Sequence, residues 1–443
     1  MTGYWAKQQQ DAMPTCVFEP SDANDVAEVV KLVSNTQCPF SIKSGGHGAF
    51  AGVSSTQGGI IISMKAFDEI KVSEDASTVT LGTGLKWAQV YETLGKQSVT
   101  VAGGRYPSVG TGGLPLGGGM SFFSSRYGWT CDNILSYEVV IADGSIIQVS
   151  NDAYSDLFWA LRGGGNNFGV VTKITMDVIP LQEQTIWGGN RIYERDHLPA
   201  LIQASYNLGT AGVEKDSGVG QILNIISAQG QKIALATLTY DKPVENPPVM
   251  EEFLSIPAAL DTMGVGTVTN ISASLASLGD VGENAENKSR ARGTATFKLS
   301  VDMMMQASDI CMEEFEGVSD LEGVDTICVF QIITKSQLAT SERHGTNAMG
   351  LHADDGPLYL LNVVIGWEDE ADGARVQPIA KKVIDRATEY GQSQGVVLDF
   401  KYINYAGQFQ DVIAGYGADN KAKLMSIAEK YDEDGVFQKL QPG

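Results

Sequence analysis

Three glycine-rich segments in the first part of the sequence surround the side chains best suited to chemistry. They span residues 44–48, 110–119 and 163–169. Flexible glycines let backbone N–H groups converge on phosphate oxygens or on an extended cofactor. One such loop is weak evidence, because glycine also tightens ordinary turns, whereas three together favour cofactor binding. Of the four histidines, only His47 lies in a glycine turn, so it is the candidate reactive side chain.

Several other chemistries are excluded by their missing motifs. Gly82-Thr83-Gly84 lacks the third glycine of the nicotinamide fingerprint, and no acidic residue follows at strand spacing. Neither GxxxxGK[ST] nor HExxH occurs, which excludes the phosphate-loop and zincin classes. Ser393 lies in a GxSxG match, but the match follows a predicted helix and precedes a strand, the reverse of a nucleophile elbow. Scattered histidines and the absence of a CxxC pair among five cysteines predict no metal site.

The overall charge narrows the range of partners. The net charge is −22, so the surface field repels phosphate backbones and anionic lipid head groups. No apolar run approaches the roughly 20 residues of a membrane-spanning helix. The expected partner is therefore a small molecule, with neither nucleic acid nor membrane, and the sequence leaves the oligomeric state open.

The elements that would position the glycine loops form a first lobe. Ser21 is the predicted N-cap of a helix through Val33, since valines recur there at helical spacing. Segment 103–119 is too rich in glycine for a regular element and should lie against a ligand. Asp143-Gly144 predicts a tight hairpin, and Ser155 predicts a helix cap. The remaining predicted elements are strands 39–43, 59–64 and 170–176 and helix 156–161.

Beyond Pro180 the pattern changes to strands alternating with longer helices. We expect an antiparallel sheet covered by helices on one face, with the other face turned toward the first lobe and a substrate pocket between the two. A final helix should return to the first lobe. The predicted elements are strands 326–334 and 358–366 and helices 248–254, 373–390 and 421–431. The predicted domains are residues 1–181, 182–395 and 396–443.

The motifs together resemble those of a known family. Ser44-Gly45-Gly46-His47 with Gly52, the GxxGxxxGGG segment at 110–119 and the segment from Arg162 through Thr172 resemble the vanillyl-alcohol-oxidase superfamily, whose FAD-binding domain is called PCMH-type. Tyr402-Ile403-Asn404-Tyr405 and the segment 431–437 resemble its berberine-bridge-enzyme-like branch. The resemblance covers nearly the whole chain. It implies an α+β fold of two lobes, with the substrate domain an antiparallel sheet covered by helices.

The same resemblance implies FAD, bonded to a ring nitrogen of His47 through its 8α carbon. Residues 43–48 would then wrap the pyrophosphate. Many relatives have a second bond, from a cysteine before a Pro-x-Val-Gly stretch, but here that position is Tyr106, so a single linkage is expected. The implied FAD contacts besides His47 are Lys43, Ser44, Gly45, Gly46, Gly48, Gly52, Pro107, Ser108, Val109, Gly110, Gly113, Gly117, Gly118, Asn133, Ile134, Gly169, Val171 and Asn404.

Asn133 and Ile134 match a loop beside the flavin ring, where side-chain bulk controls access of oxygen. Ile134 is larger than the valine of many oxidases, which leaves oxidase and dehydrogenase open. Ile134 as an ordinary core residue is an equal alternative on residue type alone. O2 is the expected acceptor for a secreted member of the family.

Tyr405 matches the catalytic tyrosine of several relatives, with Tyr402 as the reserve. A phenol with an ordinary pKa near 10 is a weak base at neutral pH, so the site must hold a cation or hydrogen-bond donors beside it. The sequence does not show which residues supply this cation or these donors. As an alternative, both tyrosines pack on a strand. Gln331 and Asn362 are polar positions on second-lobe strands, and either could bind substrate or make a structural hydrogen bond.

We therefore expect an FAD-linked oxidase acting on an alcohol or a natural-product intermediate. Three alternatives remain: a carbohydrate oxidase, a cyclase that uses FAD as a scaffold without net redox change, and a non-enzymatic binding protein. Two sequons, at Asn270 and Asn287, lie in a polar stretch suited to a surface loop, so we expect a secreted, glycosylated protein of fungal type whose leader this sequence does not include. A cytosolic protein is the second choice, and cysteine pairing stays open, with at least one thiol unpaired.

Overall fold

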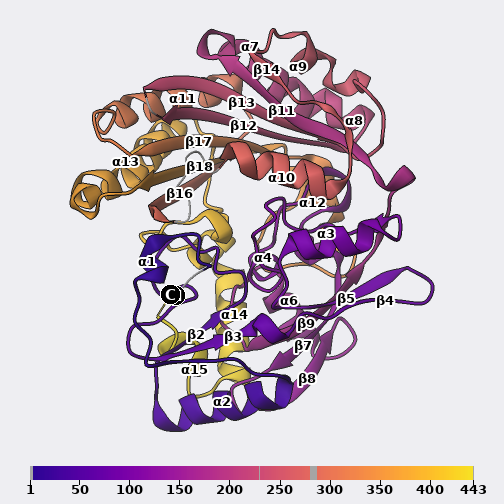
Figure 1. Ribbon diagram of the computed structural model, residues 1–443, viewed down its shortest axis with the longest axis vertical. Helices are drawn as coiled ribbons and strands as arrows, with labels where there is room; N and C mark the ends of the chain where they lie inside the picture. The colour runs from indigo at the N-terminus through magenta and orange to yellow at the C-terminus, as the bar shows by residue number, and fades with distance from the viewer. Residues whose placement is uncertain (1–2, 229, 280–286, 443) are drawn as a thin grey trace.

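A computed structural model describes residues 3–228, 230–279 and 287–442 and arranges them in two lobes (Figure 1). The first lobe, in indigo and purple, holds the glycine loops. The second, in magenta and orange, is built around one large sheet. Helices and antiparallel sheets occur in both, as expected of the predicted α+β fold.

A small parallel sheet begins the first lobe. Its strands are β1 (Cys16–Phe18), β2 (Phe40–Lys43) and β3 (Ile60–Ser63), in the order β1-β3-β2. Helix α2 (Ala23–Thr36) buries Val26, Val29, Val30 and Val33. Its N-cap is Asp22 rather than the predicted Ser21, because the Asp22 carboxylate accepts hydrogen bonds from the N–H groups of Asn24 and Asp25. The Ser21 hydroxyl instead donates to Asp25.

A second, antiparallel sheet completes the lobe in the order β4-β5-β9-β7-β8. The predicted hairpin joins β7 to β8, with Gly144 at φ 81°. Ser155 is the first helical residue of α6 and not its cap; Tyr154 occupies the cap in a left-handed conformation. Segment 103–119 is irregular as expected, except for the single turn α4. The elements are β4 (Ile70–Val72), β5 (Thr78–Gly82), β6 (Val99–Thr100), β7 (Ile134–Val140), β8 (Ile146–Ser150), β9 (Val170–Asp177), β10 (Ile179–Pro180), α1 (Lys7–Gln10), α3 (Trp87–Gly95), α4 (Gly113–Leu116), α5 (Ser124–Tyr127) and α6 (Ser155–Leu161).

The second lobe is a nine-stranded antiparallel sheet, in the order β14-β11-β13-β12-β17-β18-β16-β19 with β15 beside β11. Its helix α13 extends the predicted 373–390, and α9 follows a 3-10 turn at Pro248–Met250. The elements are β11 (Ile186–Glu194), β12 (Val219–Ala228), β13 (Gln231–Tyr240), β14 (Leu260–Asp261), β15 (Gly264–Gly266), β16 (Ser289–Lys298), β17 (Asp325–Ile333), β18 (Leu358–Trp367), β19 (Val397–Leu398), α7 (Leu198–Asn207), α8 (Val213–Lys215), α9 (Glu251–Ser255), α10 (Val268–Gly279), α11 (Val301–Glu316), α12 (Lys335–Ala339) and α13 (Gly373–Ser393).

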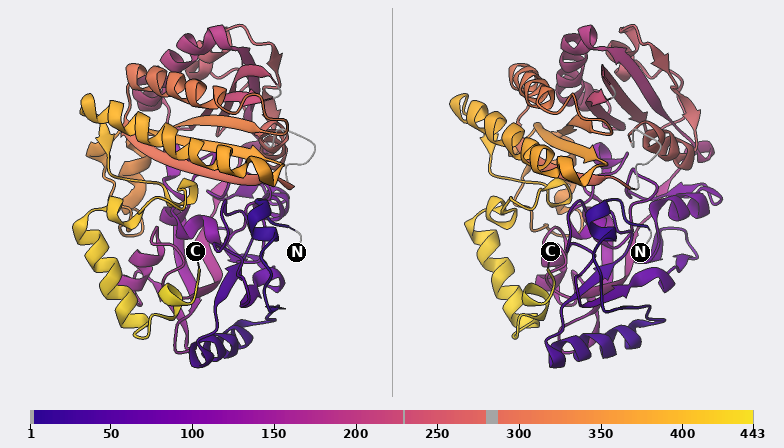
Figure 2. Two further views of the ribbon diagram at one scale, coloured as in Figure 1. Left: turned by 90° about the vertical axis from the view of Figure 1, so that its left-hand side faces the viewer. Right: turned by 60° about the vertical axis from the view of Figure 1, so that its left-hand side comes forward.

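The two faces of this sheet have different neighbours because side chains alternate along each strand. On β17, Cys328 and Phe330 join the apolar core beneath α7, α11 and α13. Val329, between them, belongs to the core shared with the first lobe, where α10 also packs. Figure 2 shows α11 and α13 lying across the outer face. The inner face therefore looks toward the glycine loops, as predicted.

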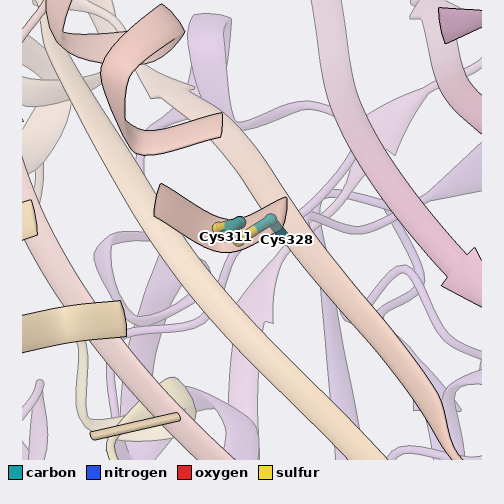
Figure 3. Close-up of a disulfide and its surroundings, with 2 residues drawn as sticks. All are labelled: Cys311 and Cys328. Atoms are coloured by element: carbon teal, nitrogen blue, oxygen red, sulfur yellow. A yellow bond between two sulfur atoms is a disulfide. The ribbon is translucent and has the colours of Figure 1, made fainter. Parts of the chain in front are cut away.

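One disulfide joins the sheet to its covering helices. Cys311 of α11 is bonded to Cys328 of β17 (Figure 3). Cys16, Cys38 and Cys131 are free thiols. Because both bonded sulfurs lie in the buried outer core, the bridge fixes α11 on the sheet.

The first sequon does not lie in a surface loop. Asn270 is exposed but belongs to helix α10, and the Ser272 hydroxyl is buried, donating to the carbonyl of Arg105 at 2.6 Å. In the second sequon, Asn287 is exposed, but Ser289 is the buried first residue of β16. The surface-loop expectation was therefore wrong for Asn270, the acceptor of the first sequon, which lies on a helix, whereas the exposed Asn287 precedes β16.

The chain end returns to the first lobe as predicted. Helices α14 (Ala418–Tyr431) and α15 (Val436–Lys439) lie along that lobe in Figure 2. The Phe437 ring meets Phe40 of β2 edge-on at 5.9 Å, and Tyr431 donates to Asp156 of α6. In the described part of the chain, no helix combines the length and apolar character needed to span a membrane.

Candidate active site

A cavity of about 650 Å³ lies between the lobes. The glycine loops of the first lobe line one side, and the inner face of β12, β16, β17 and β18 lines the other. Trp5 near the N-terminus and Pro442 near the C-terminus also reach its wall. Its volume is within the range of ligand and cofactor sites.

Two glycine loops pack so closely that no side chain fits between them. A Cβ on Gly45 would lie 2.3 Å from the Gly110 nitrogen. The Ser44 hydroxyl ties the loops further, because it donates to the Thr83 carbonyl and accepts from the Gly112 N–H at 3.2 Å. The sequence thus brings segments 44–48 and 110–119 together as one wall of the cavity.

Most of the residues predicted to contact FAD or substrate line this cavity. They are Ser44, Gly45, Gly46, His47, Gly48, Val109, Gly110, Gly113, Gly117, Gly169, Val171, Gln331, Asn362, Tyr402, Asn404 and Tyr405. The lining as described does not include Lys43, Gly52, Pro107, Ser108, Gly118, Asn133 or Ile134.

Lys43 and Ser108 stand just behind the wall. The Lys43 ammonium lies 4.4 Å from the centre of the Tyr4 ring, and Ser108 Oγ lies 3.1 Å from His47 Nε2. Ser108 therefore supports His47, whereas Lys43 packs on Tyr4, which is not among the described lining residues. Gly118 packs on Met349, where a Cβ would lie 2.7 Å from the sulfur.

The structure corrects the proposed oxygen gate. Asn133 and Ile134 are fully buried away from the cavity. The Asn133 amide donates to the carbonyls of Tyr127 and Trp129, and Ile134 begins β7 within the apolar core. Ile134 is therefore the ordinary core residue that its type also allowed.

His47 is held as a neutral imidazole. Its ring stacks on Trp5 at 5.1 Å between centroids, with 10° between planes. Burial, and then the charges of Arg292 and Arg290, lower the pKa of His47 to about 3. A neutral ring keeps a nitrogen lone pair available for bonding to an electrophilic carbon.

Tyr405 lies at the centre of a polar cluster. Its hydroxyl oxygen accepts from Arg105 Nη2 at 2.8 Å and from the Gln331 amide at 2.9 Å. Arg105 Nη2 also donates to Gln331 Oε1 at 2.6 Å, which closes the triangle. The Arg292 guanidinium lies 5.5 Å from the centre of the Tyr405 ring. These are the cation and donors that a tyrosine base requires, since they stabilise negative charge on its oxygen.

Tyr402 is far less suited to take a proton. It is 1% exposed, and burial, with the charge of Tyr405 as a second cause, raises its pKa above the usual value. Its hydroxyl accepts from the Asn404 amide at 3.0 Å, and its ring packs on Trp129. The segment forms a 3-10 turn at Ile403–Tyr405 rather than a strand, so the two tyrosines do not alternate on a sheet.

The second-lobe wall combines apolar side chains with a few amides and with Arg290 and Arg292 of β16. Gln331 on β17 donates a hydrogen bond to the Tyr405 hydroxyl, so its side chain both holds the tyrosine and lines the cavity. Asn362 on β18 lies opposite Val329 in the sheet register. Its Oδ1 is buried and accepts no hydrogen bond within the described residues, which leaves it suited to a ligand donor.

Sequence reasoning missed several residues at this site, among them Arg105, Arg292 and Trp5. Arg105 follows the pair Gly103-Gly104 inside a segment already assigned to ligand contact, so its position was a usable signal. Arg292 alternates with Arg290 on β16, but β16 was not predicted. Trp5 carries no sequence signal, because only tertiary packing brings it onto His47.

The site fits FAD. The paired glycine loops bring backbone N–H groups to a wall that excludes Cβ atoms, as pyrophosphate binding needs. The neutral His47 stands on the same wall, and the far side offers room for a substrate beside Tyr405.

Comparison with known proteins also indicates FAD binding. The family model for the FAD binding domain matches residues 14–150. The FAD-dependent monooxygenase FUP4 of Fusarium proliferatum (strain ET1) is 35% identical, over 99% of this chain and 86% of its own length. The bifunctional solanapyrone synthase of Alternaria solani is 33% identical, over 97% and 81%. The chain therefore belongs to the same family of FAD-binding enzymes as these fungal relatives. It is an FAD-dependent oxidoreductase, similar to fungal FAD-dependent monooxygenases.

Solved structures show the same fold at low identity. The 6-hydroxy-D-nicotine oxidase of Arthrobacter nicotinovorans superposes with a TM-score of 0.80 at 20% identity, covering 98% of this chain and 93% of its own. The glucooligosaccharide oxidase of Acremonium strictum, described with a 6-S-cysteinyl, 8α-N1-histidyl FAD, gives 0.77 at 20% identity, covering 98% and 92%.

Proposed function

We propose that this protein holds FAD through one covalent bond to His47 and oxidises an alcohol or a natural-product intermediate, with O2 as acceptor. The observation that carries the proposal is the Arg105–Gln331–Tyr405 triangle in the same cavity as a neutral His47. A base and a cofactor anchor on one cavity are what proton removal coupled to oxidation requires.

The chain's own residues supply the acid–base chemistry. Tyr405 accepts the proton of the substrate hydroxyl or activated C–H, while Arg105 and Gln331 donate to its oxygen. The apolar face of β12, β17 and β18 excludes water around the reacting carbon. FAD, when bound, supplies the hydride acceptor.

The single linkage is supported by the side chains near His47. Tyr106 lines the cavity with its ring 6.1 Å from the His47 ring. It stands where a linking cysteine is expected in doubly bonded relatives. Cys131 is fully buried and outside the lining as described, so it does not replace that cysteine.

The test of the linkage is whether flavin absorbance stays with acid-precipitated protein. We expect yellow colour in the wild-type pellet and none in His47→Ala. Cys131→Ala is the matched control and should keep its colour. Flavin that washes free of the wild type would refute the covalent linkage.

The names of the relatives favour monooxygenation as the second candidate. The two candidates differ in the fate of the oxygen atoms. Turnover under ¹⁸O2 should leave the organic product unlabelled if the enzyme is an oxidase, whereas a monooxygenase would place one labelled atom in it.

We also propose that the protein is secreted. The disulfide between Cys311 and Cys328 supports this, because such bonds persist in oxidising compartments. Thiol titration of denatured protein from the native source should find the three free cysteines only; five titrating thiols would favour the cytosol.

A further inference from the structure

Two buried amides of the second-lobe sheet differ in their hydrogen bonds. Asn190 of β11 is fully buried; its amide nitrogen donates to Ser274, and its Oδ1 accepts from the Thr237 hydroxyl at 2.7 Å. Asn362 of β18 is 3% exposed and lines the cavity, yet its Oδ1 has no partner among the described residues. A buried acceptor without a donor costs stability. Asn362 is therefore placed for a ligand, whereas Asn190 serves the fold.

The sheet register places Asn362 near the reacting end of the cavity. Asn362 pairs with Val329 of β17, and Gln331 lies two residues further along that strand. Gln331 is therefore a diagonal neighbour of Asn362 on the same face, at about 7–8 Å between Cα atoms. Its amide donates to the Tyr405 hydroxyl at 2.9 Å. A molecule that reacts at Tyr405 thus reaches Asn362 with a group about one six-membered ring away.

Apolar side chains flank Asn362 on this face. Val329 in the adjacent strand and Val364 two residues along β18 both line the cavity. Asn224 of β12, on the far side of Val329, carries another amide of this row, and its nitrogen donates to the Leu235 carbonyl at 3.4 Å. The Asn362 oxygen is therefore an acceptor beside apolar side chains, which suits one hydroxyl on an otherwise apolar ring.

We propose that Asn362 binds a second hydroxyl of the substrate, one ring away from the alcohol that reacts at Tyr405. The substrate is then a cyclic diol or a larger molecule that contains one. This inference rests on the proposed function, since it names the substrate class of the same site. The hydroxyl donates to Asn362 Oδ1, which rotation about the terminal side-chain bond turns toward the cavity. The ring between the two hydroxyls would lie against Val329 and Val364.

The first test compares Asn362 with Asn190 in flavin-loaded protein without substrate. Asn362→Leu replaces an unpaired acceptor with an apolar side chain of similar size, so Tm should rise by about 1–2 °C. Asn190→Leu leaves its partners unpaired and should lower Tm by about 2 °C or more. Differential scanning calorimetry measures both. A fall in Tm for Asn362→Leu would make its amide structural, and loss of flavin would assign it to FAD; either result would overturn the inference.

Three ring alcohols of similar shape test the ligand: trans-cyclohexane-1,4-diol, trans-4-methylcyclohexanol and trans-4-methoxycyclohexanol. The methyl compound lacks the second hydroxyl, and the methoxy compound keeps its oxygen without the proton. Isothermal titration calorimetry without O2 measures their affinities for the flavin-loaded protein. The wild type should bind the diol about tenfold more tightly than either analogue, since only the diol donates to the buried oxygen. In Asn362→Leu this preference should disappear.

Two binding results would overturn the inference: no preference for the diol in the wild type, including no measurable binding of any of the three, or an unchanged preference in Asn362→Leu. The proposed function fails separately, through loss of acid-stable flavin absorbance in the wild type. A yellow protein that oxidises alcohols but does not distinguish the diol from its methyl analogue would refute the second-hydroxyl site alone.

Discussion

At the residue scale, the environment of each tyrosine decides its role. Tyr405 and Tyr402 are three residues apart, and their rings meet edge-on at 4.8 Å. Arg105 and Gln331 donate to the oxygen of Tyr405, whereas Tyr402 is buried against Trp129 and has a raised pKa. Of the two, only Tyr405 has a cation and an amide donor at its oxygen.

Replacement of the two hydroxyls should separate these roles. Tyr405→Phe should lower kcat by about 10²–10⁴-fold, the usual contribution of a positioned base. Tyr402→Phe should lower it by less than about tenfold, because only a hydrogen bond from Asn404 is lost. Steady-state rates are measured on preparations matched in flavin absorbance. Equal losses in the two variants would contradict Tyr405 as the base.

His47 should make stability depend on pH in protein prepared without FAD. The ordinary pKa of 6.5 applies to the unfolded chain, and burial lowers it to about 3 in the folded state. The unfolded chain therefore binds more protons between these values, so stability falls as pH falls from about 6.5 toward 3. Between pH 7 and 5 the free energy of unfolding should drop by up to about 2 kcal/mol more than in His47→Gln. Urea unfolding at pH 7 and at pH 5 measures the free energy of unfolding of both proteins. An equal change with pH in the wild type and in His47→Gln would contradict a lowered pKa of His47.

At the scale of elements, the two glycine loops act as one unit. The backbones of Gly45 and Gly110 are in contact. A Cβ on either residue would therefore clash with the backbone of the other loop. This explains why the motifs, far apart in sequence, form a single wall. A side chain on either would push the loops apart and distort the wall that carries His47.

A pair of alanine substitutions tests this contact. Gly45→Ala should lower the flavin content of the purified protein and lower stability by about 1–3 kcal/mol through overpacking. Gly95→Ala, in α3 with no atom within 4 Å of the new Cβ, should leave stability within about 1 kcal/mol of wild type, on the stabilising side. Bound flavin and urea midpoints are measured for both. Wild-type flavin content in Gly45→Ala would show that the loops can move apart.

At the scale of the molecule, the site exists only because the lobes are held together. Arg126 of α5 in the first lobe bonds Asp241 at 2.5 Å and Asp216 at 2.6 Å in the second. Asp241 is largely buried, so its charge depends on this partner. The same helix α5 packs against β12, a strand that lines the cavity.

Loss of the bridge should loosen the two lobes. Arg126→Met should lower stability by about 1–2 kcal/mol, a value discounted for the partial exposure of Arg126, and lower Tm by roughly 1–2 °C. Arg375→Met, within the second lobe and exposed, should change Tm by less than about 1 °C. Differential scanning calorimetry measures both. An equal Tm in the wild type and in Arg126→Met would mean that the apolar interface alone joins the lobes.

The sequence by itself determined the local features of this protein. Turn glycines, the Asp143-Gly144 hairpin and the valine spacing of α2 depend on near neighbours, so they could be predicted. The motifs also indicated the FAD-binding class, and with it His47, Tyr405 and the two-lobed α+β fold. The cap at Asp22 was missed by one residue because Ser21 and Asp22 are both good capping residues, and the cap at Tyr154 because its left-handed backbone, without a side-chain cap, has no sequence signal.

Only the tertiary structure decided which side chains meet. Arg105 and Gln331 are 226 residues apart, and Trp5 reaches His47 from the N-terminus. Ile134 turned inward because β7 is buried between its neighbours, and Asn133 because its amide donates to the carbonyls of Tyr127 and Trp129. Contacts of this kind depend on how two lobes pack across a cavity. The charge that collects there is a property of the assembled wall and of no single segment.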